Sequence, residues 1–385
     1  MSNRSKDVHV SHAETLPPLP KIDWSLINQK APTVVDLGNP SKETPLPKAD
    51  VVVITWTVAE WSALDHVFVN SDTTRTTSSK AFHKEWSYRA NEDSSFEGYY
   101  LWGYYRMVKI TNQNGKELDV LLWKASAHLA HPPYGKGLEK MVEVILEESK
   151  PSQLYTIGTA GGASVNECLG DAVFTNCGVV KIEQDPDSEK SKEKYEANEY
   201  LEGATVSCDT WFPSMDLFKQ VEENLLFKLD QVVTMEELNE VLYETIHNPE
   251  KGNPAWEGTC TIEDFINEAI DPKNLGSPKG LDKKDVPMLT TDYYYIATPE
   301  DGDKYAALEM DDTVVGIVAK RMGVDCVMVR NISDPVVPFV KKDGKPFADG
   351  LRNAFSGGIY EHFGFYSSMN GAILTWATIA ADNNL

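Results

Sequence analysis

Cysteine is scarce in this sequence, and no two cysteines lie close together. The chain has 385 residues and five cysteines, with no CxxC pair among them. Structural zinc sites use closely spaced cysteines, and a disulfide framework needs a denser set in a shorter chain. We therefore expect free, mostly buried thiols, no metal site and no disulfide framework.

Long hydrophobic runs are also missing. No apolar stretch approaches the roughly 20 residues that a membrane-spanning helix needs. The segment MSNRSKDVHVSHAETLPPLP at the start contains no hydrophobic region of the kind that signal peptides carry. We expect a cytoplasmic protein that has no membrane partner.

Positive charge is in short supply. The chain has 36 Lys and Arg against 59 Asp and Glu, which gives a net charge of −23, and the acids are spread over its whole length. Such a surface repels the nucleic-acid backbone and anionic lipid, so duplex nucleic acid is not an expected partner. The hydrophobic share of 41% is ample for the core of one large α/β domain with insertions or of two domains.

Two segments differ in character from the rest. Residues 1–48 are polar and proline-rich, with LPPLPK and TPLPK, and we predict an extended or partly disordered N-terminal arm. Residues 49–385 form the predicted domain. Within it, Thr234 and Thr261 each begin a helix-start pattern, so we predict a helical insertion at about 230–285.

Apolar runs and helical periodicities alternate through the domain, which favours an α/β fold. The sequence predicts strands at 51–54 and 154–157, a hairpin of 99–110 and 117–123 around an Asn-Gly turn, and helices from about 58, over 134–150, over 215–229 and over 360–381. The strand at 154–157 leads into the glycine-rich stretch 158–162, GTAGG, which we predict to be a turn that lets a ligand approach the backbone.

The stretch 305–336 carries most of the acidic residues of interest. Val314, Val318 and Met322 recur at the helical period, and Gly323 follows where a left-handed residue ends a helix. Residues 326–329, CVMV, have no polar alternation and predict a central, parallel strand buried on both faces. Asp334 then lies at the carboxyl end of that strand, which is where α/β sheets bind ligands.

These segments together resemble a known family. LEMDD, followed after one helix and one strand by RNISDP, resembles the purine nucleoside phosphorylase and nucleosidase superfamily, and so do GTAGG, the Gly170-Asp171 element and the TTDYY segment at 290–294. The pattern is closest to methylthioadenosine/S-adenosylhomocysteine nucleosidase and AMP nucleosidase. The resemblance implies a three-layer nucleoside-phosphorylase-like fold with a mixed central sheet flanked by helices, and no cofactor.

The family cleaves the N-glycosidic bond of purine nucleosides, which needs an acid at the base, a nucleophile at the sugar and acceptors for the ribose hydroxyls. By resemblance, Asp334 is the acid and Glu60 activates water. The remaining implied contacts are Asp311 and Glu309 to the ribose, Met310 against the sugar, Tyr294 stacked on the base, Tyr295 through its backbone, and Thr159, Ala160 and Gly161 along the sugar or anion side.

The chain departs from the family pattern at three places. Met310-Asp311 stands where the family has Met-Glu, so the side chain is one methylene shorter. Bulky Trp56 replaces a small residue after the first strand, and KASAHLAH, with His128 and His131, replaces a glycine-rich segment.

The sequence leaves the exact reaction open. TWTVAE after the first strand has no arginine for phosphate, which favours hydrolysis and release of a free base, with adenine favoured. The alternatives are a phosphorylase, a nucleoside-sensing module without turnover, and cleavage of AMP or ATP as in phage defence. For that last case, the candidate phosphate partners are Lys124, His128, Lys136, Lys304 and Arg330. By analogy with the family we expect a homodimer.

Overall fold

The strand predicted at 51–54 lies in the middle of the fold. The computed structural model places it at Val51–Thr55 as β2, between β5 and β6. Val51 and Val53 belong to the hydrophobic core on one face of the sheet, whereas Val52 and Ile54 belong to the core on the other. The strand is buried on both faces, which explains its unbroken apolar run.

The structure describes residues 21–70, 72, 84–184, 188–209, 215–228, 277–298, 300–302, 304–334, 349–382 and 384–385. Its strands are β1 Thr33–Val34, β2 Val51–Thr55, β3 Ser87–Ala90, β4 Leu101–Thr111, β5 Glu117–Ala125, β6 Gln153–Gly161, β7 Ala172–Thr175, β8 Cys177–Lys181, β9 Thr205–Ser207, β10 Gly280–Asp282, β11 Met288–Thr291, β12 Leu308–Glu309 and β13 Asp325–Asp334. Its α-helices are α1 Val58–Phe68, α3 Tyr134–Ser149, α4 Glu189–Asn198, α5 Met215–Asn224, α8 Asp312–Arg321 and α9 Asp349–Ala381.

The sheet mixes parallel and antiparallel pairs. Strand β2 pairs in parallel with β5 and β6, and β6 pairs in parallel with β13. Strand β13 is antiparallel to β7, so the predicted parallel environment of residues 326–329 is correct on one side only. The reason is that burial on both faces removes the alternation of polar and apolar residues along a strand, but it does not determine whether the neighbouring strand is parallel or antiparallel.

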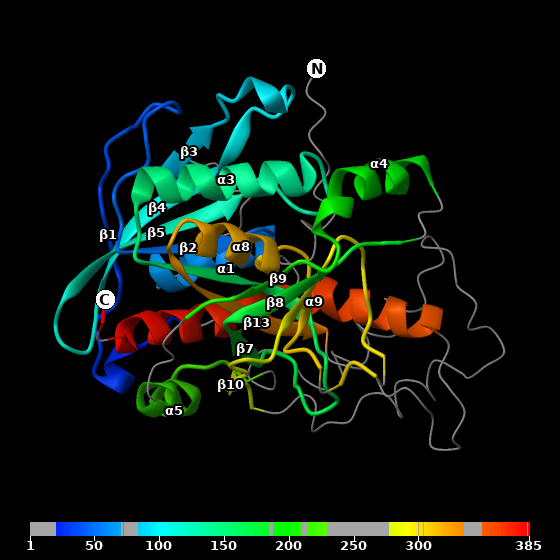
Figure 1. Cartoon of the computed structure of the whole chain (residues 1–385). Helices are drawn as coiled ribbons and strands as arrows, with labels where there is room; N and C mark the ends of the chain where they lie inside the picture. Colours follow the sequence, from blue (N-terminus) through cyan, green and yellow to red (C-terminus); the bar gives the residue numbers. More distant parts are fainter. Residues whose placement is uncertain are drawn as a thin grey trace, which may run out of the picture.

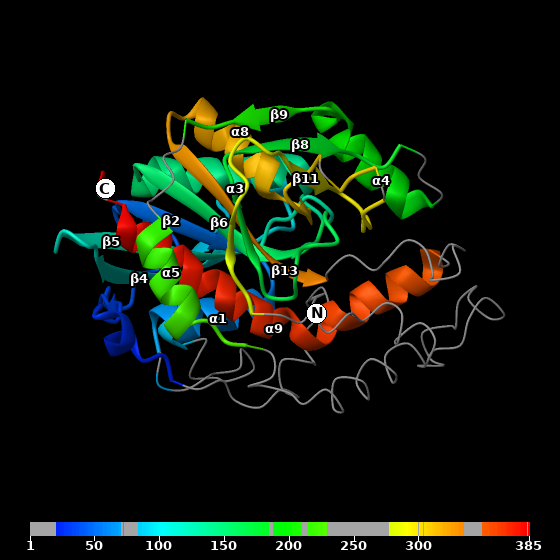
Figure 2. The same ribbon diagram turned by 90° about the horizontal axis from the view of Figure 1, so that it is seen from below.

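Helices cover both faces of this sheet, as Figures 1 and 2 show. Helices α3 and α8 pack on one face, where they supply Leu138, Met141 and Val318 to the core. Helices α1, α5 and α9 pack on the opposite face. The predicted class, a mixed central sheet between two layers of helices, is confirmed.

Most of the predicted elements are present, with one informative difference. The hairpin is formed by antiparallel β4 and β5, and the helix predicted at 134–150 is α3. Of the residues predicted as a turn at 158–162, residues 158–161 instead continue β6, which pairs with β13 as far as Gly161. Long-range pairing therefore overrides the local turn propensity of glycine.

The N-terminal arm predicted at 1–48 lies partly outside the described residues, which begin at 21. From there the chain follows the domain surface: Trp24 is buried against Trp376 of α9, and β1 pairs with β4. Of the insertion predicted at about 230–285, residues 230–276 lie outside the described part. The remainder includes β10, a strand parallel to β7.

None of the helices in the described part of the chain combines the length and apolarity that a membrane span requires.

The carboxyl ends of β2, β6 and β13 meet at one edge of the sheet, since all three strands run in the same direction. A ligand site is expected at such an edge.

Candidate functional site

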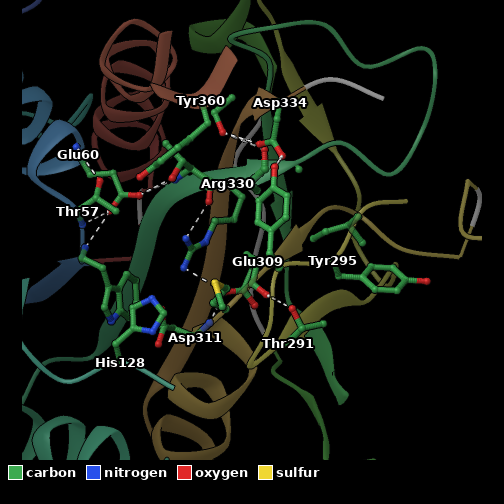
Figure 3. Close-up of a pocket in the computed structure, with 18 of the residues that line it drawn as sticks. Thr57, Glu60, His128, Thr291, Tyr295, Glu309, Asp311, Arg330, Asp334 and Tyr360 are labelled. Atoms are coloured by element: carbon green, nitrogen blue, oxygen red, sulfur yellow. Dashed lines mark hydrogen bonds and ion pairs between the residues drawn. The ribbon is translucent and has the colours of Figure 1, made fainter. Parts of the chain in front are cut away.

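A cavity of about 300 Å³ opens at this edge. Its walls come from the ends of β2, β6, β12 and β13, from the segment after β11, from the loop before α3 and from α9. All the candidate site residues line it: Glu60, Thr159, Ala160, Gly161, Tyr294, Tyr295, Glu309, Met310, Asp311 and Asp334 (Figure 3). The fold thus brings together residues that are up to 274 positions apart in the chain.

Glu60 enters the cavity because helix α1 begins with a capping box. Thr57 is the N-cap, and its side chain accepts from the backbone N–H of Glu60 while Glu60 accepts from the N–H of Thr57. The Oε2 atom of Glu60 also accepts from Thr55 Oγ1 and from Trp56 N, both at 2.9 Å. Its Oε1 atom accepts from Thr159 N and Oγ1, both at 2.8 Å.

These donors decide the ionisation of Glu60. Burial alone raises the pKa of this carboxyl, but the Arg330 guanidinium and the N–H groups of Thr159, Thr57 and Trp56 outweigh it, so the pKa of Glu60 is lowered. Glu60 is therefore a buried carboxylate that stays charged.

Arg330 lies beneath the cavity on β13. Its Nε donates to Asp312 Oδ2 at 2.8 Å, its Nη2 pairs with Asp312 Oδ1 and lies 3.2 Å from Glu309 Oε2, and its Nη1 donates to Thr159 O at 3.1 Å. The guanidinium also lies 5.0 Å from the ring centroid of Trp56. From the sequence, Arg330 was only a candidate partner for phosphate. In the structure, its guanidinium is instead paired with the carboxylates of Asp312 and Glu309.

Glu309 holds the turn between β12 and α8. Its carboxylate accepts from Thr290 Oγ1, from Asp311 N and, at 2.9 Å, from Asp312 N. Burial and the nearby Asp312 raise the pKa of Glu309 to about 8, against the effect of Arg330. Glu309 lines the cavity, but its oxygens are already engaged within the chain.

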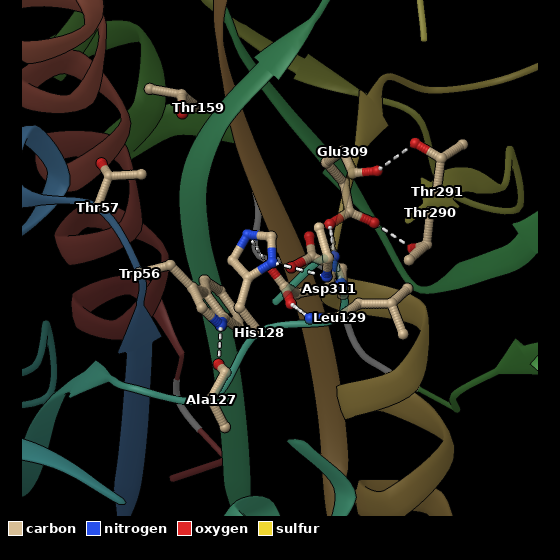
Figure 4. Close-up of polar contacts among 12 residues, drawn as sticks. Trp56, Thr57, Ala127, His128, Leu129, Thr159, Thr290, Thr291, Glu309 and Asp311 are labelled. Carbon is tan, nitrogen blue, oxygen red and sulfur yellow. Dashed lines mark hydrogen bonds and ion pairs between the residues drawn. The ribbon is translucent and has the colours of Figure 1, made fainter. Parts of the chain in front are cut away.

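Asp311 lies at the N-cap of α8 with its carboxylate facing the loop before α3 (Figure 4). Its Oδ1 accepts from Leu129 N at 2.9 Å, and its Oδ2 lies 3.2 Å from His128 Nε2. Burial raises the pKa of Asp311 to about 8, and the N–H of Leu129 is the main opposing contact. The sequence contained no signal for the His128 contact beyond the unusual KASAHLAH segment.

Asp334 ends β13 at a point where the pairing with β6 shifts register. Its Oδ1 accepts from Ser333 Oγ at 2.7 Å, and its Oδ2 accepts from Ser356 Oγ of α9 at 2.8 Å. Burial raises the pKa of Asp334 to about 6, although these hydroxyls and that of Tyr294 oppose the shift. Asp334 is thus a carboxyl that can carry a proton under mildly acidic conditions.

Tyrosine side chains also line the cavity that contains Glu60 and Asp334. Tyr294, expected to stack on a base, is 52% exposed, and its hydroxyl lies 2.6 Å from Ser356 Oγ and 3.4 Å from Asp334 Oδ2. The Tyr295 hydroxyl donates to Asp301 Oδ2 at 2.9 Å. Tyr360 of α9 extends over Glu60, and its hydroxyl hydrogen-bonds with the side chains of Thr57 and Thr159 (Figure 3).

Ser356 and Tyr360 were not predicted as site residues, because no motif in the sequence includes them. Both lie on α9, which begins at Asp349, whereas the sequence predicted a helix over 360–381 only. The first half of α9 extends past the edge of the sheet (Figure 2), so Tyr360 lines the cavity and Ser356 reaches the Asp334 carboxyl.

Comparison with known proteins gives similarity in structure only. No family model matches the chain, and no curated protein matches it significantly in sequence. Among solved structures, futalosine hydrolase of Helicobacter pylori is similar with 10% identity and a TM-score of 0.41, covering 85% of this chain and 96% of that one.

Two further solved structures have comparable scores. The 5′-methylthioadenosine/S-adenosylhomocysteine nucleosidase of Helicobacter pylori has 10% identity and a TM-score of 0.41, covering 86% of this chain and 98% of that one. The S-adenosylhomocysteine nucleosidase of Streptococcus pyogenes has 12% identity and a TM-score of 0.39, covering 87% and 98%. These similar structures belong to the superfamily that the motifs resemble, but at such identity and TM-score the likeness carries no argument about activity.

Proposed function

We propose that the protein hydrolyses the N-glycosidic bond of a purine nucleoside and releases the free base. One observation carries this proposal: Asp334 and Glu60 line the same cavity, and their surroundings push the pKa values of the two carboxyls in opposite directions. A pair of carboxyls separated in this way supplies a proton donor and a permanent negative charge. Cleavage of a glycosidic bond needs both.

Asp334 acts as the acid in this proposal. A purine anion is a poor leaving group, so protonation of its imidazole nitrogen lowers the barrier to departure. The hydroxyls of Ser333 and Ser356 fix the orientation of the Asp334 carboxyl, and the hydroxyl of Tyr294 lies beside it. Adenine is the favoured base by resemblance to the family.

Glu60 acts at the sugar. Its oxygens accept from five donors of the chain, so its orientation is fixed and its basicity is low. Such a carboxylate orients a water molecule and stabilises the positive charge that develops at C1′, more than it removes a proton early in the reaction. Asp311 and Met310, which line the same cavity, hold the ribose.

Water is favoured over phosphate as the nucleophile. Among the described residues that line the cavity, Arg330 is the only arginine or lysine, and its guanidinium is paired with Asp312 and Glu309. Glu60, Asp311 and Asp334 also line the cavity, and Glu60 stays charged. This charge disfavours inorganic phosphate, and it also disfavours the 5′-phosphates of AMP and ATP.

The test is to incubate the protein with adenosine, methylthioadenosine, S-adenosylhomocysteine, AMP and ATP, with and without phosphate, and to measure free base chromatographically. We expect adenine without phosphate, and a loss of about a hundredfold or more in Asp334→Asn, which cannot donate the proton in the same way. The matched control is Asp325→Asn, the same change at the exposed start of β13, which should retain activity.

Other results would contradict the proposal in distinguishable ways. Formation of ribose 1-phosphate only when phosphate is present would establish a phosphorylase. Binding of adenosine-type ligands without release of base from any of them would favour a sensing module.

A further inference from the structure

The loop between β5 and α3 brings His128 to the cavity. His128 and His131 form an isolated antiparallel bridge in this loop, and their rings lie with centroids 5.2 Å apart. Both line the cavity, and the His128 ring faces Asp311 (Figure 4). The family has a glycine-rich segment in place of this loop, so the resemblance assigns no role to His128. A role for its contact with Asp311 is therefore inferred from the geometry alone.

The backbone determines which nitrogen of His128 carries the proton. The N–H of Ala130 donates to His128 Nδ1 at 3.0 Å, so Nδ1 is an acceptor and is not protonated. The neutral ring therefore has its proton on Nε2, the atom that lies 3.2 Å from Asp311 Oδ2. His128 thus points an N–H donor at this carboxylate.

A second donor from the same loop fixes the other oxygen of Asp311. The N–H of Leu129, the next residue, donates to Asp311 Oδ1 at 2.9 Å. Two consecutive residues hold both oxygens, while Asp311 still lines the cavity. Each carboxylate oxygen can accept more than one hydrogen bond, so the side chain remains able to accept from a ligand hydroxyl.

The ionised form of Asp311 needs these donors. Burial raises the pKa of Asp311 to about 8, and Asp312 and Glu60 act in the same direction, whereas Leu129 N–H and Arg330 oppose them. A donor directed at the charged form favours that form. The charged and titratable groups around the contact are Glu60, Glu309, Asp312 and Arg330, with His131 against the His128 ring.

We propose that His128 is a positioning residue for sugar recognition: its Nε2–H holds Asp311 as an ionised, oriented acceptor for the ribose hydroxyls. This inference rests on the proposed function. It also accounts for Asp311 at the position where the family has a glutamate. The loop before α3 holds the carboxylate of this shorter side chain in the orientation that the ribose hydroxyls need. The protein should therefore prefer ribonucleosides to nucleosides that lack the sugar hydroxyls.

The test compares two substitutions that differ in the reach of one nitrogen. In His128→Gln the amide nitrogen can occupy the place of Nε2, whereas in His128→Asn it lies nearer to that of Nδ1 and cannot reach Asp311. The measured quantity is the ratio of kcat/KM for adenosine to that for 2′,3′-dideoxyadenosine. This ratio does not depend on how much of a variant is folded.

We expect His128→Asn to lower this ratio by about tenfold to a hundredfold, as for the loss of a hydrogen bond to a charged group, and His128→Gln to retain most of it. The pKa of Asp311 should rise in His128→Asn and not in His128→Gln. It is measured as the pH at which kcat/KM for a 4-nitrophenyl riboside, whose leaving group needs no proton, reaches its plateau. Equal losses on both substrates, or equal ratios in the two variants, would overturn the role of His128.

Failure of the proposed function would be recognised separately. If the unaltered protein releases no base from adenosine or from any of the other substrates tested, the hydrolase proposal fails. Calorimetric binding of adenosine and 2′,3′-dideoxyadenosine to the same variants then decides the role of His128. If the unaltered protein releases base but the variants show no change in discrimination, only the inference about His128 fails.

Discussion

At the scale of single residues, the acid–base pair gives the activity a defined dependence on pH. Asp334 must be protonated to serve as the acid, and its pKa lies at about 6. The protonated fraction therefore falls about tenfold for each pH unit above that value. Asp311, with a pKa of about 8, must be ionised to hold the ribose, and its ionisation offsets the loss of protonated Asp334 between about pH 6 and pH 8. We therefore expect kcat/KM for adenosine to be nearly constant over that range and to fall as the pH rises above about 8.

A chromogenic riboside provides the control for the fall of kcat/KM at high pH, because an aryl leaving group such as 4-nitrophenolate departs without a proton. Its hydrolysis should lack the alkaline fall, and Asp334→Asn should still cleave it. A profile for adenosine that keeps rising between about pH 6 and pH 8, as that of the aryl riboside should, would contradict the assignment of Asp334 as the acid.

Residues that follow strands or helix starts could be placed from the sequence, but their partners could not. Asp334 was predicted at the edge of the sheet because a buried strand leads to it, and Glu60 was identified by resemblance to the family. The contacts between Arg330 and Thr159, or between His128 and Asp311, join positions more than 170 residues apart. Such contacts are set by the sheet order, which local patterns do not contain.

At the scale of elements, strand β6 shows why a glycine was needed. A Cβ atom on Gly158 would lie 2.2 Å from Arg330 Nη1 and 3.0 Å from Glu60 Oε1. The sequence suggested that these glycines make room for a ligand, but at Gly158 the room is taken by the side chains of the site itself. The glycine allows the strand and the charged cluster to approach each other.

Gly158→Ala should therefore displace the Arg330 guanidinium and the Glu60 carboxylate. We expect a loss of about 1–3 kcal/mol in the free energy of unfolding, as for other overpacked sites, together with a fall in kcat. Chemical denaturation and steady-state kinetics measure the two effects. Gly357→Ala in α9 is the stability control, since in the described part of the chain no atom outside the neighbouring backbone of this helix lies within 4 Å of the added methyl group. Equal stability of the two variants would refute the packing argument.

At the scale of the whole molecule, the two ends of the described chain pack together. The predicted arm has few apolar residues, which favours an extended chain, and nothing local in it reveals a partner. Trp24 nevertheless lies in the main core, 4.4 Å from Trp376 between ring centroids. The partner belongs to the last helix, so the contact becomes visible only once the fold is complete.

Trp24→Ala should lower the free energy of unfolding by about 3–5 kcal/mol, because it removes a large buried ring and leaves a cavity. Thermal or denaturant unfolding measures this change. Leu26→Ala, two residues away at a side chain that is 57% exposed, is the control and should have little effect. A small effect of Trp24→Ala would mean that the N-terminal segment contributes little to the stability of the domain.

The contact between Trp56 and Arg330 makes the cavity optically observable. The indole of Trp56 lines the cavity, donates from Nε1 to Ala127 O at 3.1 Å and lies against the guanidinium. Indole emission is sensitive to nearby charge and to displacement of water, and a ligand in this cavity changes both. Intrinsic fluorescence therefore offers a readout of occupancy that needs no turnover, with the tryptophan already built into the wall.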